Sequence, residues 1–285
     1  MSPPPTAVPT SSKAAELYLN LLKRVLTRYA FGESYRAIRP RPGTAKAAAM
    51  NAVAAGLRPL KLELVKREEF NAEARRLGMD IPADAETMIG ITRLDNLQFC
   101  IEDIIANHVA GDLIETGVWR GGAVIFMQAV LTVHEETARS VWVADSFQGL
   151  PPPDLGRYPQ DRDSDLHTYG HLQISLEEVR RNFERYQLLA DNVHFLKGWF
   201  KDTLPTAPVQ RLAIMRLDGD YYESTRDALR NLYHRLSPGG YAIIDDYAED
   251  TWTYCRKAVD EFRTEHHIRD PLIRVDDKCY YWQRS

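Results

Sequence analysis

The chain has 285 residues, of which 44% are hydrophobic, and this is enough to bury the core of one full domain. Its formal net charge of −4 gives no general attraction to nucleic acid. No apolar run reaches the roughly 20 residues that a membrane-spanning helix needs. The longest candidate, Ala45–Leu57, is rich in alanine, too short, and bordered by Lys46 and Arg58.

The first residues are predicted to form a disordered tail, residues 1–12. They are rich in Pro, Ser and Thr, and they lack the basic segment and apolar stretch of a secretion signal. The three cysteines, Cys100, Cys255 and Cys279, are widely spaced and odd in number, which fits neither a disulfide framework nor a zinc site. We therefore expect a soluble protein of the reducing cytoplasm.

Residues 13–84 are predicted to form an N-terminal helical region. Apolar residues recur at helical spacing in residues 14–29, and residues 62–77 have the pattern of a charged amphipathic helix. The sequence RPRPG at 39–43 and the Ile81-Pro82 pair are predicted breaks. We expect this region to complete a pocket for the substrate or to form a contact between subunits.

Strands and helices alternate in the remainder of the chain. The predicted strands are 112–116, 141–144, 193–196, 212–217 and 241–246, and the predicted helices are 94–109, 123–134, 176–186, 224–236 and 252–264. This order predicts a doubly wound α/β fold with a mostly parallel sheet. Two closing runs, 272–275 and 279–282, are close enough to form a hairpin that would add an antiparallel strand. Ligands of such sheets bind beyond the carboxyl ends of the strands.

The first two strands end in residues suited to a nucleoside. ETGVWRGG at 115–122 offers a glycine turn before a helix, but it is neither a GxGxxG fingerprint nor a phosphate loop with its lysine. Asp145 ends the second strand and could accept hydrogen bonds from ribose hydroxyls. Alone it could equally be a turn or cap residue. Beyond the next strand, Gly198, Trp199 and Phe200 could hold an adenine ring or could pack in the core.

Four aspartates follow two strongly apolar strands. Asp218 and Asp220 lie in RLDGD, and Asp245 and Asp246 lie in IIDDY. If these strands are neighbours about 4.8 Å apart, the carboxylates repel one another unless a cation neutralises them. An all-oxygen set favours Mg²⁺, Mn²⁺ or Ca²⁺ over zinc. The alternative is that they cap the following helices, which explains one aspartate per strand better than the adjacent pair.

Several motifs together resemble one enzyme family. They are TMIG at 87–90, RLDNL at 93–97, IETGV at 114–118, VADSFQG at 143–149, GWFKDT at 198–203, MRLDGD at 215–220, SPGGY at 237–241 and DDY at 245–247. In this order, over residues 85–285, they are similar to those of the TylF/MycF-type macrocin O-methyltransferases. Those enzymes are metal-dependent and methylate sugar hydroxyls during antibiotic biosynthesis.

The resemblance implies a Rossmann-like class I methyltransferase domain at 85–285, with seven strands of which the last is antiparallel. It implies metal ligands at Asp218, Asp245 and Asp246, with Asp218 also the general base. His167, in the long loop 148–173, matches a histidine near the reacting hydroxyl; otherwise it would be a solvated surface residue. The implied positions for S-adenosylmethionine are Thr87, Met88, Glu115, Thr116, Gly117, Asp145, Ser146, Gly198, Trp199, Phe200 and Asp218.

The sequence therefore predicts an O-methyltransferase that uses S-adenosylmethionine and Mg²⁺ to methylate a sugar hydroxyl of a small glycosylated natural product. A metal that binds two adjacent hydroxyls lowers their pKa, and Asp218 would take the proton, a role that His167 could share. Loop 148–173 is interpreted as a lid. Two alternatives stay open: a phenolic or catechol acceptor, and a non-catalytic nucleoside-binding protein of the same fold. The family suggests a homo-oligomer, a dimer or larger.

Overall fold

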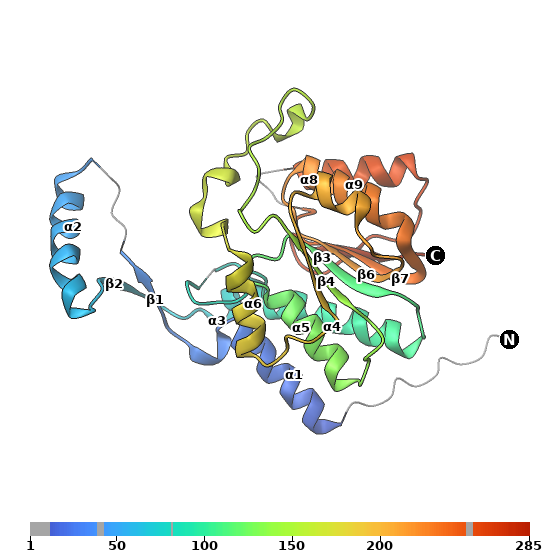
Figure 1. The fold of residues 1–285 in the computed structure, drawn as a ribbon, viewed down its shortest axis with the longest axis horizontal. Helices are drawn as coiled ribbons and strands as arrows, with labels where there is room; N and C mark the ends of the chain where they lie inside the picture. Colours follow the sequence, from blue (N-terminus) through green and yellow to red (C-terminus); the bar gives the residue numbers. More distant parts are fainter. Residues whose placement is uncertain (1–11, 39–42, 81, 249–252) are drawn as a thin grey trace.

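The computed structural model describes residues 12–38, 43–80, 82–248 and 253–285. The predicted tail lies almost wholly outside these ranges, as do most of the RPRPG break and Ile81. A single large sheet forms the centre of the molecule, and helices cover both of its faces (Figure 1). None of the helices in the described ranges is long and apolar enough to cross a membrane.

The large sheet has the strand order β5-β4-β3-β6-β7-β9-β8. Its first five strands in chain order are parallel, and β9 runs antiparallel between β7 and β8. The predicted mostly parallel sheet with a closing hairpin is thus confirmed. The bounds are β3 Asp112–Thr116, β4 Val141–Asp145, β5 Val193–Lys197, β6 Leu212–Leu217, β7 Leu236–Ile244, β8 Ile273–Arg274 and β9 Tyr280–Gln283.

The order of the sheet determines where a ligand can bind. The chain adds β4 and β5 on one side of β3 and then crosses to place β6 and β7 on the other side. The connections therefore leave β3 and β6 in opposite directions, which opens a crevice at their carboxyl ends. Both strands are almost wholly buried, so only their ends can present side chains to a ligand.

Two hydrophobic cores lie on the two faces of the sheet, and helices close each of them. Helix α5 is apolar on all sides because α1 and α4 cover the surface that the sheet leaves free. The helices of this face are α1 Lys13–Leu26, α4 Ile91–Ala106, α5 Gly122–Val133 and α6 Leu176–Arg185. The helices of the other face are α7 Phe200–Thr203, α8 Tyr222–Leu232 and α9 Tyr254–Glu265.

The prediction of one helix over residues 62–77 is wrong. The structure has strand β2, Val65–Glu68, paired with β1, Ser34–Ala37, and then the short helix α3, Ala72–Leu77. Asn71 divides the segment because its side chain caps α3 by accepting a hydrogen bond from the Ala74 amide at 3.0 Å. In β2, Glu68 pairs with Arg36 across the hairpin, whereas Glu73 and Arg76 do form an ion pair along a helix, the short α3.

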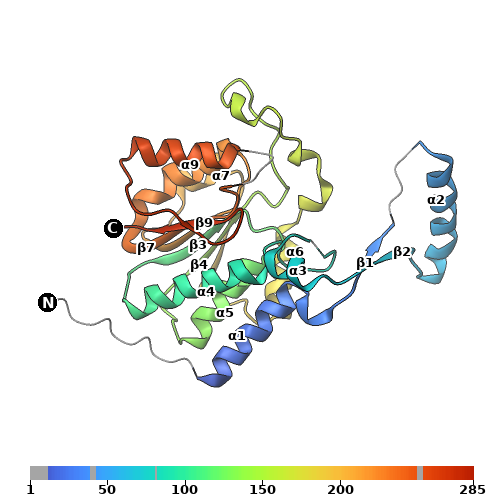
Figure 2. The ribbon, with the colours of Figure 1, turned by 180° about the vertical axis from the view of Figure 1, so that it is seen from behind.

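Residues 33–38 and 43–69, which we call the arm, stand apart from the rest of the molecule. They contain β1, helix α2 (Ala45–Leu57) and β2. In both views the arm projects sideways beyond the end of α1, and α2 lies at its far end (Figures 1 and 2). By contrast, α1 packs on α5 through buried leucines and is part of the main body.

Candidate metal and nucleoside site

The ends of β3 and β6 meet at Gly117. This residue has φ 85°, and a Cβ atom there would lie 1.7 Å from the backbone oxygen of Asp218. The Asp218 amide also donates to the Thr116 carbonyl at 2.9 Å. Only glycine allows this approach, because any side chain would collide with backbone and would disfavour the positive φ. Gly117 therefore fixes the position of Asp218 as well as forming the turn.

Asp145 ties the glycine turn to the end of β4. Its carboxylate accepts a hydrogen bond from the Val118 amide at 2.8 Å and one from the Phe147 amide at 2.7 Å. Burial raises the pKa of this carboxyl group, and the two amides act in the opposite direction. The Ser146 hydroxyl also lies 3.4 Å from one of the carboxylate oxygens, and the carboxylate as a whole can still accept a hydrogen bond from a ligand.

A pocket with about 770 Å³ of empty space opens over these strand ends. Part of this space is open to the solvent, so a small molecule can enter the pocket from outside. The predicted positions that line it are Met88, Gly117, Asp145, Ser146, Gly198, Trp199, Phe200 and Asp218. Asp220, one of the four aspartates noted in the sequence, also lines the pocket, and the sequence did not single out further lining residues such as Leu150, after β4, and Glu223, on α8.

Three predicted cofactor positions do not line the pocket. Glu115 is 1% exposed and is paired with Arg216 beneath the pocket. Thr87 is buried, and its hydroxyl accepts a hydrogen bond from the Ile89 amide at 3.3 Å. Thr116 is also buried within β3. The side chains of these residues therefore support the pocket wall and do not reach its interior.

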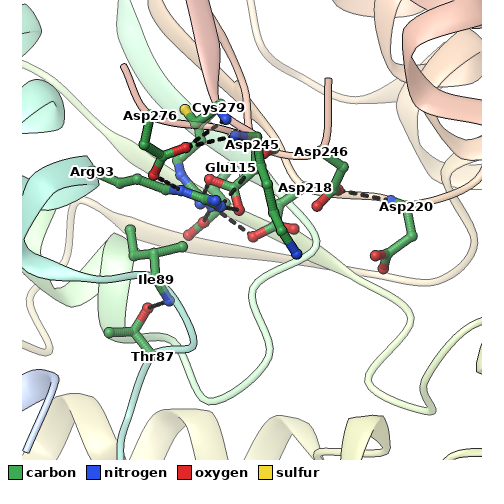
Figure 3. A network of polar contacts seen from close by, with 12 residues as sticks. Thr87, Ile89, Arg93, Glu115, Asp218, Asp220, Asp245, Asp246, Asp276 and Cys279 are labelled. Atoms are coloured by element: carbon green, nitrogen blue, oxygen red, sulfur yellow. Dashed lines mark hydrogen bonds and ion pairs between the residues drawn. The ribbon is translucent and has the colours of Figure 1, made fainter. Parts of the chain in front are cut away.

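Carboxylates gather at the carboxyl ends of β6 and β7 (Figure 3). One oxygen from each of Asp218, Asp245 and Asp246 lies within 4.8 Å of the others. The three come together because β6 and β7 are parallel neighbours that end in register, Leu217 beside Ile244. We call these three residues the acidic cluster.

Two buried arginines contact the acidic cluster from below. Arg216 donates to Asp218 at 2.9 Å and also pairs with Asp245 and Glu115. Arg93, on α4, donates to Asp245 at 2.6 Å and to Asp276 at 2.7 Å. Neither role was predicted from the sequence. The one available signal was Arg216 itself, a charged residue inside the otherwise apolar strand LAIMRL.

The arginines do not remove the repulsion among the carboxyl groups. Burial, followed by the charge of Asp245, raises the pKa of Asp218 to about 6 although Arg216 lowers it. Burial and the neighbouring aspartates raise the pKa of Asp246 well above its usual value. Burial raises the pKa of Glu115 to about 8. The local structure thus still favours an added positive charge.

The acidic cluster fits a hard divalent cation. Metal–oxygen distances of about 2.1 Å for Mg²⁺ and about 2.4 Å for Ca²⁺ place opposite ligand oxygens about 4.2–4.8 Å apart. Both oxygens of Asp245 already accept from arginine, but each carboxylate oxygen has a second lone pair for a cation. Cys279 lies nearby, and burial raises the pKa of its thiol well above the usual value, so this sulfur stays neutral.

Helix capping does not explain the four aspartates. The first amides of α8, at Tyr222 and Glu223, donate to the side chain of Asp161 at 2.7 and 3.1 Å. Helix α9 begins after Thr253, well beyond Asp246 in the chain. The capping alternative therefore fails for both strands, and the gathering of carboxylates needs another reason.

His167 lies on a loop that borders the pocket. Its amide donates to the hydroxyl of Tyr221 at 3.2 Å, and Tyr221 directly follows Asp220. Its Nδ1 atom is buried and has no hydrogen-bond partner within the described part of the chain. Leu172 of the same loop lines the pocket, and the indole of Trp119 donates to the His171 carbonyl at 2.8 Å. His167 itself is not a lining residue.

Comparison with known proteins identifies close relatives. The family model of the macrocin-O-methyltransferases (TylF) matches residues 15–284. The 8-demethyl-8-(2,3-dimethoxy-alpha-L-rhamnosyl)-tetracenomycin-C 4'-O-methyltransferase of Streptomyces olivaceus is 49% identical over 95% of this chain and 94% of its own length. The mycinamicin III 3''-O-methyltransferase of Micromonospora griseorubida is 45% identical over 96% and 98%. The structure of the O-methyltransferase NovP superposes with a TM-score of 0.80 at 46% identity, over 95% and 99%.

Proposed function

The chain belongs to the macrocin O-methyltransferase family and is an O-methyltransferase, and from this premise we propose its reaction. We propose that it transfers a methyl group from S-adenosylmethionine to a sugar hydroxyl of a small glycosylated molecule, with Mg²⁺ at the acceptor. The observation that carries this proposal is the acidic cluster at the edge of a pocket that the glycine turn also lines.

The donor would lie across the ends of β3, β4 and β5. Its ribose hydroxyls would donate to the free lone pairs of Asp145, whose position the Val118 and Phe147 amides fix. Its adenine would lie beside Trp199 and Phe200, which line the pocket. Asp218, at the end of β6, would then lie next to the donor, since β3 and β6 are adjacent strands.

The acceptor hydroxyl would be activated at the acidic cluster. Asp218, Asp245 and Asp246 would hold Mg²⁺, which when bound lowers the pKa of a neighbouring hydroxyl. The hydroxyl oxygen forms a bond to the methyl carbon as the carbon–sulfur bond breaks, and the hydroxyl proton passes to Asp218. Arg216 holds Asp218 and Asp245 in place during this step, and Arg93 holds Asp245. We propose that His167, in the loop 148–173, can also accept this proton.

The acceptor class is inferred from the relatives. The names of two relatives specify a rhamnosyl tetracenomycin and mycinamicin III as the molecules that those enzymes methylate. A third relative, from Streptomyces niveus, is the demethyldecarbamoylnovobiocin O-methyltransferase, 54% identical over 76% of this chain. These names support a small-molecule acceptor of antibiotic biosynthesis for this chain too.

We predict that the purified protein adds one methyl group to a glycosylated acceptor with adjacent sugar hydroxyls. The assay incubates the protein with S-adenosylmethionine and a panel of deoxysugar-bearing natural products and catechols, and reads the mass increase of each acceptor. EDTA should abolish the product because the acceptor loses its cation, and excess Mg²⁺ should restore it. Methylation of catechols alone would contradict the assignment of a sugar acceptor. Full activity in EDTA would contradict the proposed requirement for a metal ion.

A further inference from the structure

Asp161, in the middle of loop 148–173, is a buried carboxylate that has no part in the proposed reaction. It is fully buried, although an aspartate normally stays in water unless its charge is paired or hydrogen-bonded. Its two oxygens accept hydrogen bonds from the amides of Tyr222 and Glu223, at 2.7 and 3.1 Å. Burial raises the pKa of this carboxyl group, and the two amides act in the opposite direction. Such a position for an aspartate of a connecting loop indicates a specific task.

The contact of Asp161 is with the first turn of α8. The first amides of a helix have no partner inside the helix, and their partial positive charge attracts a carboxylate. A helix is usually capped by the residue just before it, but in the described part of the chain Tyr221 provides no side-chain cap for α8. The cap comes instead from Asp161, which is 61 residues away from Tyr222 in the chain. This contact therefore fastens the loop to α8.

Two further contacts hold the loop segment 158–167 on the same helix start. The ring of Tyr158 lies 5.9 Å from the ring of Tyr222, measured between centroids. At the other end of the segment, the His167 amide donates to the Tyr221 hydroxyl at 3.2 Å. Because Asp161 lies between these two contacts and makes two hydrogen bonds itself, its carboxylate fixes where His167 lies.

The start of α8 is joined to the acidic cluster by a short turn. In this turn Asp220 has φ 56°, a conformation that few residues other than glycine adopt. The Asp220 amide donates to the carboxylate of Asp246 at 3.2 Å. Both Asp220 and Glu223 line the pocket. Asp161 thus connects the loop that carries His167 to the turn that borders the acidic cluster.

The two ends of the loop have attachments of their own. The Ser146 hydroxyl donates to the Gly149 carbonyl at 2.6 Å, and the indole of Trp119 donates to the His171 carbonyl at 2.8 Å. Both attachments lie beside the glycine turn and the end of β4, where the donor is proposed to bind. A change at Asp161 should therefore displace the middle of the loop and leave the donor side in place.

We infer that Asp161 is a positioning residue for the acceptor half of the reaction. It holds segment 158–167 on the start of α8, so that His167 keeps its place near the acidic cluster and can accept the proton. Asp161 itself is buried and does not line the pocket, so it acts through His167 and not by contact with the acceptor. This role rests on the proposed function, because it needs a proton to be accepted at His167.

The first test compares turnover with donor binding in Asp161→Ala. The turnover number at saturating acceptor should fall by about 10–100-fold, since a displaced catalytic group loses its orientation. The affinity for S-adenosylhomocysteine, measured by calorimetry, should stay within about twofold of the wild type. Asp161→Asn keeps one oxygen that can accept from one of the two amides, so it should lose less turnover than Asp161→Ala.

The matched control is Ser175→Ala. Ser175 caps α6 by accepting from the Glu178 amide at 3.2 Å, and it does not line the pocket. This variant also removes a helix cap, but it should keep wild-type turnover. Circular dichroism of every variant should match that of the wild type. If Asp161→Ala does not fold, Asp161→Asn carries the comparison of turnover with donor affinity.

The second test asks whether Asp161 acts through His167. In a His167→Ala background, Asp161→Ala should lower turnover by no more than about twofold further, since residues that act as a unit are not additive. A residue with a purely structural role would cost the same in both backgrounds. Hydrogen exchange, read by mass spectrometry, should become faster in segment 158–167 of Asp161→Ala, and this readout needs no turnover.

The possible failures can be told apart. Wild-type turnover in Asp161→Ala, an equal loss in both backgrounds or unchanged hydrogen exchange in segment 158–167 would each overturn the role of Asp161 and leave the proposed reaction standing. If the wild type transferred no methyl group to any acceptor, the proposed function would be wrong, and the role of Asp161 would be overturned with it.

Discussion

Asp218→Asn is expected to lower turnover by about 10²–10⁴-fold, the usual contribution of a general base. The amide keeps the shape of the side chain and can still accept the hydrogen bond from Arg216, but it cannot take up the proton of the acceptor hydroxyl. Donor binding should change little, because the donor contacts the pocket at many other residues. Turnover is measured at saturating acceptor, and donor affinity by calorimetry.

The matched control for this variant is Asp202→Asn, an exposed aspartate on α7 that does not line the pocket. It removes the same charge from the same chain and should leave turnover unchanged. If Asp218→Asn retained wild-type turnover, Asp218 would not be the base. A loss of donor affinity as large as the loss of turnover would instead make Asp218 a binding residue.

Arg216→Met is expected to destabilise the fold by about 3–5 kcal/mol, the typical cost of removing one member of a buried ion network. Arg216 contacts Glu115, Asp218 and Asp245, and the side chains of Arg216 and Glu115 are almost completely buried. Without the guanidinium, Glu115 loses its arginine partner in a place that water cannot reach, and the buried Asp245 keeps only Arg93. Urea unfolding, monitored by circular dichroism, measures the free energy of unfolding.

Arg226→Met provides the comparison for Arg216. Arg226 is also a largely buried arginine, but Glu265, with which it forms an ion pair, has a half-exposed side chain and can be solvated when the arginine is gone. A loss of about 1 kcal/mol or less is expected for this variant. Equal unfolding free energies for the two variants would mean that Arg216 does not neutralise the carboxylates at the strand ends.

The sequence was sufficient to predict the sheet and the convergence of the aspartates. Apolar runs that end in acidic residues predict strand ends, and a parallel sheet brings the ends of neighbouring strands to one edge. The structure accordingly places Asp218, Asp245 and Asp246 within one cluster. The adjacency of β6 and β7, on which the prediction depended, is a property of the fold that the alternation of elements implies.

The network beneath the cluster could not be predicted in the same way. Arg93 and Asp245 are 152 residues apart in the chain, and no local pattern connects α4 with the end of β7. The prediction from the sequence considered only a bound metal ion as the positive charge that balances the carboxylates. It did not include the guanidinium groups of Arg93 and Arg216. Glu115 was assigned to the cofactor because of its place before the glycine turn, although its side chain points into this network.

The shape of the N-terminal region could not be predicted from the sequence either. A charged run such as VKRE fits an exposed helix and an exposed hairpin equally well, and long-range pairing with β1 decides between them. The alanine-rich α2 was noticed only as too short to span a membrane. Its exposed position follows from how the arm leaves the body, which periodicity does not encode.

The binding of a divalent cation to the acidic cluster is the central claim, and Mn²⁺ titration followed by electron paramagnetic resonance tests it most directly. The free ion gives a strong signal that is lost on binding, so the affinity is measured without any turnover. The wild type should bind one ion per chain. Asp246→Asn should bind at least about tenfold more weakly, as one ligand of three is lost, and Asp227→Asn, in the same pocket but outside the cluster, should bind like the wild type. Equal affinity in all three proteins would contradict the account.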